Sequence, residues 1–141
     1  MSRLVVVDAS VVIKWFVPEV HSDGALRYLD PDLERNAPEL LLAEVSNILW
    51  KKVGRGELTA LQANKIAEDV GQADVNIHPM RPLFGPGLRI ALDTGRSAYD
   101  CIYLALADSL STRVVTADRR LYNALQGSTY SRLVLWVEDG P

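Results

Sequence analysis

The sequence predicts an α/β fold in which a central, mostly parallel β-sheet carries helices on both faces. Short β-branched runs such as RLVVV, RVVTA and RLVLWV alternate with longer segments of helical periodicity. These runs are almost entirely apolar, which is typical of strands covered on both sides. The 141 residues are 48% hydrophobic and contain no linker-like or low-complexity tract, so we expect a single domain over residues 1–141.

The N-terminal segment is expected to form a strand followed directly by a helix. The strand covers residues 3–7, and Ser10 is then placed to cap a helix that runs to about Phe16. Residues 19–39 are acidic and rich in turn-forming residues, so they are interpreted as a solvated surface with one short helix around 24–29.

Two antiparallel helices are expected next. Pro38 suits the first turn of a helix that ends near Gly54, where basic residues and a glycine mark a C-terminus. Thr59 and Gln62 form a potential capping box for the second helix. A short strand is then expected at residues 75–79.

The C-terminal part again alternates helices and strands, which supports a parallel sheet. Its expected elements are a Pro/Gly-rich loop around 79–87, a helix ending near Gly95, a helix opened by Ser97, a strand at 113–117, a helix opened by Asp118 and a last strand at 132–137.

Four acidic residues lie against or within apolar stretches: Asp8, Glu44, Asp100 and Asp118. Asp8 and Asp118 follow expected strands, so both should lie at the same edge of a parallel sheet. Glu44 shares a helix face with Leu40, Leu41 and Ile48, and the helix around Asp100 is apolar nearly all round. Burying an uncompensated charge is costly, so we expect the four acids to share a cation.

The chemistry of these ligands favours a hard divalent ion. Two carboxylates about 4 Å apart repel each other by about 4 kcal/mol at an effective dielectric of about 20. A divalent cation reverses the sign of that energy, and an all-oxygen ligand set favours Mg²⁺ or Mn²⁺ over zinc. Such a site can polarise a phosphodiester and activate a water molecule for in-line attack.

Each acid also has a purely structural interpretation. Asp118 could be only a helix N-cap, Asp100 could belong to a capping pair with Ser97, and Asp8 could cap a turn. Glu44 could form an ion pair with Lys51 or Arg96. The joint placement of all four is harder to explain in this way than any one of them.

The overall charge permits a nucleic-acid partner without demanding one. The chain has 15 basic and 18 acidic residues, for a formal net charge of −3. Removing the four candidate ligands leaves 14 acids against 15 bases, a net charge of +1.

No apolar run is long enough to span a membrane and no signal peptide is recognisable, so we expect a cytoplasmic protein. The single cysteine, Cys101, is expected to pack in the core.

Four segments together resemble a known family. VVVDASVVIKWFVPE, APELLLAEVSNILWKK, SAYDCIYLALA and VVTADRRL are similar, in order and spacing, to PIN-domain ribonucleases of the VapC type, the toxins of type II toxin–antitoxin systems. The resemblance covers essentially the whole chain. It implies an Mg²⁺-dependent endoribonuclease, with Mn²⁺ as a possible substitute, that cuts an RNA substrate. It also implies a homodimer and a cognate antitoxin.

The resemblance further implies roles for individual residues. Asp8, Glu44, Asp100 and Asp118 would hold the metal, while Ser10 and Thr116 would orient ligands or metal-bound water.

Basic and aromatic residues near these motifs could contact RNA. Lys14, Arg96 and Arg119 are the favoured phosphate contacts because they lie close in sequence to the acids. Trp15 and Phe16 could line an antitoxin groove or stack on a base, although core packing explains at least one of them more simply. Trp50 and Trp136 are expected to pack in the core. His21 and His78 lie outside the motifs, which argues against metal-free acid–base chemistry.

Two other functions compete with the nuclease. A PIN fold could serve as an RNA-binding or regulatory module with little or no catalysis, although such a module has no reason to keep four mutually repelling acids. Alternatively, Asp8 could be the nucleophile of a phosphohydrolase. That chemistry usually requires a second acid two residues later, where this chain has Ser10.

Overall fold

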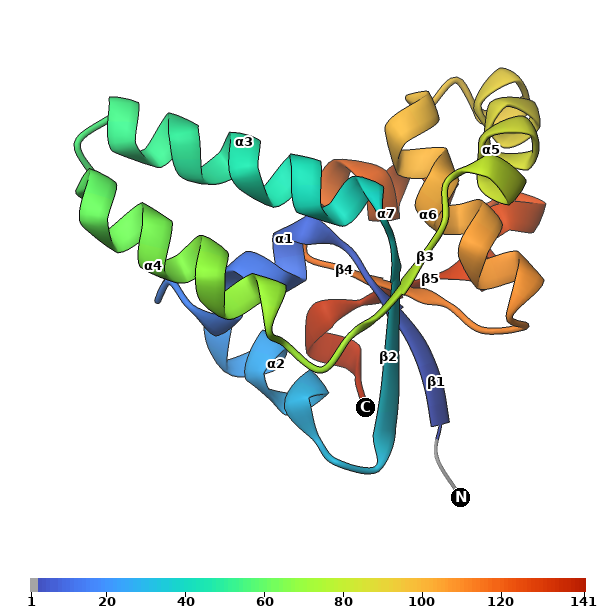
Figure 1. Ribbon diagram of the computed structural model, residues 1–141. Coiled ribbons are helices and arrows are strands. Elements are labelled where there is room, and N and C mark those ends of the chain that lie inside the picture. Colours follow the sequence, from blue (N-terminus) through green and yellow to red (C-terminus); the bar gives the residue numbers. More distant parts are fainter. Residues whose placement is uncertain (1–2) are drawn as a thin grey trace.

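The computed structural model, which describes residues 3–141, contains a five-stranded parallel sheet with the strand order β3-β2-β1-β4-β5 (Figure 1). The α/β class and the parallel sheet predicted from sequence are confirmed. The strands are β1 (Arg3–Val7), β2 (Leu33–Pro38), β3 (Asn76–His78), β4 (Val114–Thr116) and β5 (Val134–Trp136).

Seven α-helices and four short 3₁₀ helices connect these strands within the described residues. The α-helices are α1 (Ala9–Val12), α2 (Ser22–Leu26), α3 (Leu40–Gly54), α4 (Ala60–Gly71), α5 (Arg81–Thr94), α6 (Ala98–Ser109) and α7 (Arg119–Leu125). The 3₁₀ helices are η1 (Ile13–Trp15), η2 (Arg27–Leu29), η3 (Thr129–Leu133) and η4 (Val137–Asp139).

Helices cover both faces of the sheet because consecutive residues of β1 point to opposite sides. Val6 is fully buried among side chains of α5, α6 and α7, whereas the next residue, Val7, packs with α1, α3 and α4. Figure 1 shows the α3–α4 pair and the α5–α6 pair on opposite sides of the strands. The prediction of helices on both faces is therefore confirmed.

The strand order reverses direction between β1 and β4. From β1 the chain builds outward to β2 and β3, whereas β4 lies on the other side of β1 and continues to β5. Val6 pairs with Val114 and Val7 with Val115. Sites in open α/β sheets form beyond the carboxyl ends of strands at such a reversal, so this edge is where chemistry is expected.

The prediction for residues 19–39 was partly wrong. A helical segment is present over α2 and η2, but residues 33–38 form β2, an interior strand between β3 and β1, and are mostly buried. Pro38 is therefore the last residue of a strand, and α3 begins at Leu40. The sequence LERNAP concealed this strand because two of its buried side chains, Arg35 and Asn36, are polar.

Both polar side chains of β2 find partners in the interior, which makes their burial tolerable. The Arg35 guanidinium donates to the carbonyl oxygens of Tyr28, Asp30 and Asp74, each at 3.0 Å. The Asn36 amide donates to the carbonyl oxygen of Val5 at 3.3 Å. These contacts exist only after the chain has folded, so local sequence does not reveal them.

The expected cap of the first helix was misplaced by two residues. Asp8, and not Ser10, is the N-cap of α1, because its carboxylate accepts a hydrogen bond from the Val11 amide at 3.2 Å. By contrast, the capping box of Thr59 and Gln62 and the caps at Ser97 and Asp118 are as predicted. Cys101 is buried, as expected.

The expected loop at residues 79–87 is instead mostly helical. Helix α5 begins at Arg81, where Pro82 suits the first turn, and it continues through Pro86 and Gly87. Gly87 is buried where α5 meets α6, and a Cβ atom there would lie 3.0 Å from the Ile102 side chain. A glycine that would otherwise weaken a helix thus allows the two helices to pack closely.

No helix within residues 3–141 combines the length and apolar character needed to cross a membrane.

We predict that Gly87→Ala destabilises the protein, whereas Gly71→Ala at the exposed end of α4 does not. The Gly87 methyl group would crowd Ile102, an overpacking cost on the order of 1–3 kcal/mol. A Cβ atom at Gly71 meets no atom within 4 Å, so that substitution should stabilise α4 by up to about 1 kcal/mol. Urea unfolding of both variants measures the difference, and equal effects would contradict this packing.

Candidate active site

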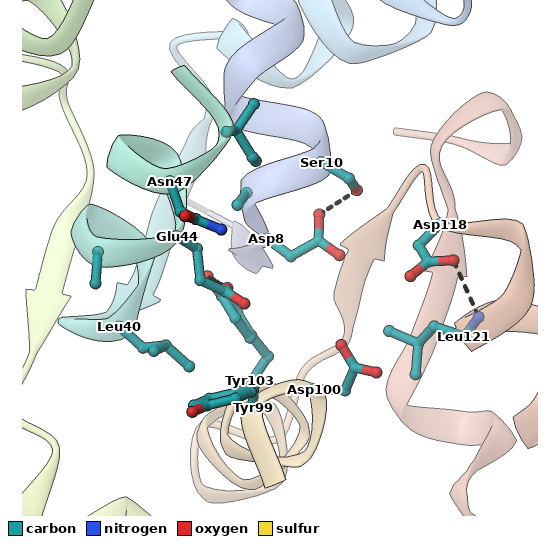
Figure 2. A pocket seen from close by; sticks show the side chains of 13 residues that line it. Asp8, Ser10, Leu40, Glu44, Asn47, Tyr99, Asp100, Tyr103, Asp118 and Leu121 are labelled. Carbon is teal, nitrogen blue, oxygen red and sulfur yellow. Dashed lines mark hydrogen bonds between the residues drawn. The ribbon is translucent and has the colours of Figure 1, made fainter. Parts of the chain in front are cut away.

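A cavity of about 490 Å³ opens at the carboxyl ends of β1 and β4 and brings the four acidic residues together (Figure 2). Glu44 comes from α3, Asp100 from α6, and Asp8 and Asp118 from the turns that follow β1 and β4. The cavity is lined by Asp8, Ala9, Ser10, Leu40, Ala43, Glu44, Asn47, Ile48, Tyr99, Asp100, Tyr103, Asp118 and Leu121.

Asp8 is the most deeply buried of the four acids, with 8% of its surface exposed. Burial raises the pKa of its carboxyl to about 7, and the negative charge of Asp118 acts in the same direction. The Ser10 hydroxyl donates to Asp8 Oδ1 at 2.5 Å and, with the Thr116 hydroxyl and the Val11 amide, partly opposes this rise in pKa. Asp8 is therefore a carboxyl group whose negative charge the protein itself compensates poorly.

Ser10 and Thr116 connect the ends of β1 and β4. The Ala117 amide donates to Ser10 Oγ at 2.9 Å, and the Asp118 amide donates to Thr116 Oγ1 at 3.0 Å. The two hydroxyl oxygens lie 3.5 Å apart. Both residues thus hold the backbone that carries the acids, which is compatible with the orienting role predicted for them.

Asp118 caps a helix and lines the cavity at the same time. Its Oδ1 atom accepts hydrogen bonds from the amides of Arg120 at 3.0 Å and Leu121 at 3.3 Å. Oδ2 accepts no hydrogen bond from the described residues. The capping interpretation is therefore correct, and it leaves one carboxylate oxygen available to another ligand.

Asp100 lies in the first turn of α6, where the Ser97 hydroxyl accepts its amide hydrogen at 3.2 Å. Burial raises the pKa of the Asp100 carboxyl, and the charge of Asp118 adds to this effect. The Arg96 guanidinium lies 3.7 Å from Asp100 Oδ2 and acts in the opposite direction on the pKa. Arg96 is the only cation within 4 Å of any of the four acids among residues 3–141.

Glu44 on α3 is hydrogen-bonded to a tyrosine from α6. The Tyr103 hydroxyl donates to Glu44 Oε1 at 2.7 Å, and the tyrosine side chain is almost completely buried. Burial raises the pKa of the Glu44 carboxyl, the Tyr103 hydrogen bond opposes that rise, and Asp100 reinforces it. The pKa of the Tyr103 hydroxyl is itself raised by burial and by Glu44, so this group remains a proton donor.

The four acids form an electrostatically linked group that is not closely clustered. Asp118 raises the pKa values of Asp8 and Asp100, and Asp100 raises that of Glu44. However, within the part of the chain that the structure describes, no three His, Cys, Asp or Glu side chains lie close enough to hold one metal ion. The donor chemistry fits a hard divalent cation, but the spacing is wider than a coordination sphere.

Three residues of the cavity were missed from the sequence. They are Tyr103, Tyr99 and Asn47, which line the cavity. In the sequence they look like parts of apolar helical patterns or ordinary residues of a helix surface. Helical spacing could have identified two of them, since Asn47 lies three residues after Glu44, and Tyr103 three residues after Asp100.

The three predicted phosphate contacts do not line the cavity, and each already contacts another side chain. Lys14 forms an ion pair with Glu19 at 2.9 Å, and Arg96 lies beside Asp100. The Arg119 guanidinium stacks over the Trp136 ring, 3.7 Å from its centroid. Their role in binding RNA stays a prediction, and for Lys14 it would require breaking a half-buried ion pair.

The remaining aromatic and histidine residues lie outside the cavity. Trp136 is buried as expected, but the prediction that Trp50 packs in the core was wrong, because 71% of its surface is exposed. Nor do His21 and His78 lie near the acids. The His21 ring is 3.2 Å from Glu138, and the His78 ring is 2.8 Å from Asn36.

We predict that Asp8→Asn stabilises the metal-free protein at pH 8 and has little effect near pH 4. The raised pKa means that the folded state binds the proton more tightly than the unfolded state. Below about pH 4, Asp8 is protonated in both states and the protein keeps its full free energy of unfolding. As the pH rises to about 7, this free energy falls by up to about 1.4 kcal/mol per pH unit.

Asparagine keeps the capping oxygen without the charge, so it removes this loss. Thermal unfolding in EDTA between pH 4 and pH 8 measures the effect, with the exposed Glu68→Gln as the control. A wild-type advantage at pH 8 would contradict the assignment.

We also predict that Tyr103→Phe raises the pKa of Glu44 further. The hydroxyl stabilises the ionised carboxylate by a hydrogen bond, so its loss favours the protonated form. An NMR titration of the Glu44 carboxyl carbon in metal-free protein measures this pKa. Tyr99→Phe is the matched control because Tyr99 lines the same cavity without bonding to Glu44, and equal shifts in both variants would exclude the specific contact.

Comparison with known proteins supports the resemblance seen in the sequence. The family model described as PIN domain matches residues 5–125 of the chain. Ribonuclease VapC3 of Pyrobaculum aerophilum is 32% identical over 118 residues, which cover 82% of this chain and 90% of that protein.

Solved structures agree with this relationship. The crystal structure of PAE2754 from Pyrobaculum aerophilum has a TM-score of 0.69 and 25% identity, and the match covers 96% of this chain and 85% of that one. A toxin–antitoxin complex from Klebsiella pneumoniae has a TM-score of 0.66 at 15% identity, with 93% and 95% coverage, and so shows the shared fold. The chain therefore belongs to the PIN-domain family and is one of its VapC-type members.

Proposed function

We propose that the chain is a metal-dependent endoribonuclease and the toxin component of a type II toxin–antitoxin system. The observation that carries the proposal is the gathering of four carboxylates from four separate segments around one cavity. The curated relative from Pyrobaculum aerophilum is named a ribonuclease, which supports the same activity here. Mg²⁺ is the proposed metal, with Mn²⁺ as a substitute, because the ligand atoms are all oxygen.

The proposed mechanism assigns a role to each acidic residue. Asp8, Glu44, Asp100 and Asp118 would surround a hydrated metal ion and hold it partly through its own water molecules, since no three of them lie within one coordination sphere. The metal would supply an activated water for attack on the RNA phosphodiester. Tyr103 keeps one oxygen of Glu44 engaged, and the α7 amides engage one oxygen of Asp118. The second oxygen of each carboxylate would then face the metal and water. Ser10 fixes the orientation of Asp8 through its hydrogen bond.

The proposed partners are RNA, a cognate antitoxin and a second copy of this chain. The structural neighbour from Klebsiella pneumoniae was solved as a toxin–antitoxin complex, which supports an antitoxin for this chain. An apolar hollow beside α4, bordered by Phe16, Leu58, Leu61 and Ile66, offers a surface that such a partner could cover.

We predict that the purified protein cleaves RNA in Mg²⁺ and that EDTA, Asp8→Asn and Asp100→Asn each reduce cleavage by at least about 100-fold. Loss of one ligand from a metal site removes most of its ability to activate water. Cleavage of total RNA with mapped ends measures activity, and thermal unfolding confirms that each variant folds.

Glu68→Gln serves as the control because Glu68 is an exposed carboxylate outside the cavity. Unchanged cleavage in both aspartate variants would exclude the metal assignment. RNA binding without cleavage, and without dependence on metal, would favour the RNA-binding module considered from the sequence.

A further inference from the structure

The cavity has two chemically different sides. Asp8, Asp100 and Asp118 lie on one side, whereas the other, formed by α3 and α6 around Glu44, is mostly apolar and aromatic (Figure 2). A hydrated metal ion and a phosphate need only the acidic side. The α3–α6 side is lined by Leu40, Ala43, Asn47 and Tyr99, and Ile48 lies one helical turn beyond Glu44.

RNA whose scissile phosphate reaches the acids brings a flanking base within reach of this second side. A scissile phosphate is joined through a single sugar to the base on each flank, so at least one flanking base must lie within a nucleotide's reach of the carboxylates. The apolar side borders the acids directly, since Glu44 and Asn47 are neighbours on α3 and Tyr99 precedes Asp100 on α6. An unpaired base fits this position because its faces are apolar and its edges are polar.

Tyr99 has the exposure that a stacking residue requires. Its side chain is 62% exposed, although Cys101 to Ala107, later on the same helix, are all buried. An aromatic ring beside a catalytic centre can stack on any base, and such stacking stabilises single-stranded RNA on many proteins.

Asn47 provides polar groups that can read a base edge. It is exposed, lines the cavity and forms no side-chain hydrogen bond with any residue between 3 and 141. An asparagine amide has two donors and one acceptor oxygen, so it can pair with the edge of a base that is not in a duplex.

We propose that Leu40, Ala43, Asn47 and Tyr99 form a subsite for one unpaired nucleobase next to the scissile phosphate. Tyr99 stacks on the base, Asn47 bonds to its edge, and the two apolar side chains exclude water from its other surface. The subsite rests on the proposed ribonuclease function and adds a preference for single-stranded RNA with a particular base beside the cut.

Cleavage kinetics on short single-stranded RNAs test this subsite. The RNAs contain a mapped cut site and carry each of the four bases, or an abasic nucleotide, on either flank. Wild-type protein should discriminate among bases at one flank. Tyr99→Ala should lower kcat/KM on intact RNA by roughly 5- to 100-fold, with no further loss on the RNA that is abasic at that flank.

Tyr99→Phe, which keeps the ring, should retain most of the activity. Asn47→Ala should reduce discrimination among bases more than it reduces the rate on the preferred RNA. Trp50→Ala is the matched control, because Trp50 is also a largely exposed aromatic residue and lies outside the cavity. It should leave base discrimination unchanged.

A binding readout that does not depend on turnover completes the experiment. RNA with 2-aminopurine at the discriminated flank is mixed with the Asp8→Asn variant, which should leave it uncut. Stacking on Tyr99 should quench the 2-aminopurine fluorescence. The double variant Asp8→Asn/Tyr99→Ala should not quench it.

The two proposals fail in different ways. If the wild-type protein cuts no RNA, the ribonuclease function fails. If it cuts RNA but Tyr99→Ala slows intact and abasic RNA equally, the subsite alone is wrong. A Tyr99→Ala variant that loses binding to a protein partner but keeps its base discrimination would likewise overturn the subsite.

Discussion

The pairing of β1 with β4 is the constraint on which the candidate site depends. It places the end of β1 beside β4, although β2 and β3 lie between these two strands in the sequence and on the other side of β1 in the sheet. Asp8 and Asp118 therefore meet across a distance of more than a hundred residues, and the bond from the Ala117 amide to Ser10, 107 residues apart, joins the same two ends. The helices α3 and α6 then add Glu44 and Asp100 from opposite faces of the sheet.

The electrostatics of this edge are unfavourable for the protein alone. Burial raises the pKa values of Asp8, Glu44 and Asp100, and the acids raise one another's pKa values further. Only Arg96 approaches any of them within 4 Å among the described residues, while Lys14 and Lys52 are both engaged by Glu19. The protein itself compensates these negative charges poorly, which is the electrostatic argument for the proposed cation. Within the described residues, no three of the carboxylates lie close enough to coordinate one metal ion directly.

Prediction from sequence succeeded where local patterns decide structure and failed where distant contacts do. The caps at Thr59, Ser97 and Asp118 rest on side chains that bond to amides two or three residues away, so they were predicted correctly. Strand β2 was missed because the partners of Arg35 lie in other segments. The first half of helix α5 was taken for a loop because it is rich in proline and glycine, although Gly87 is required there by the close approach of Ile102.

The sequence by itself determined the α/β class, the identity of the four acids and the resemblance to PIN-domain proteins, because these depend on residue types and on spacing along the chain. Only the tertiary structure decided which other side chains share the cavity. Tyr103 holds Glu44, Tyr99 and Asn47 border the acids, and Lys14 turns away to Glu19. The physical reason is that a side chain's direction depends on how helices pack against the sheet. Proximity along the chain does not imply proximity in the fold.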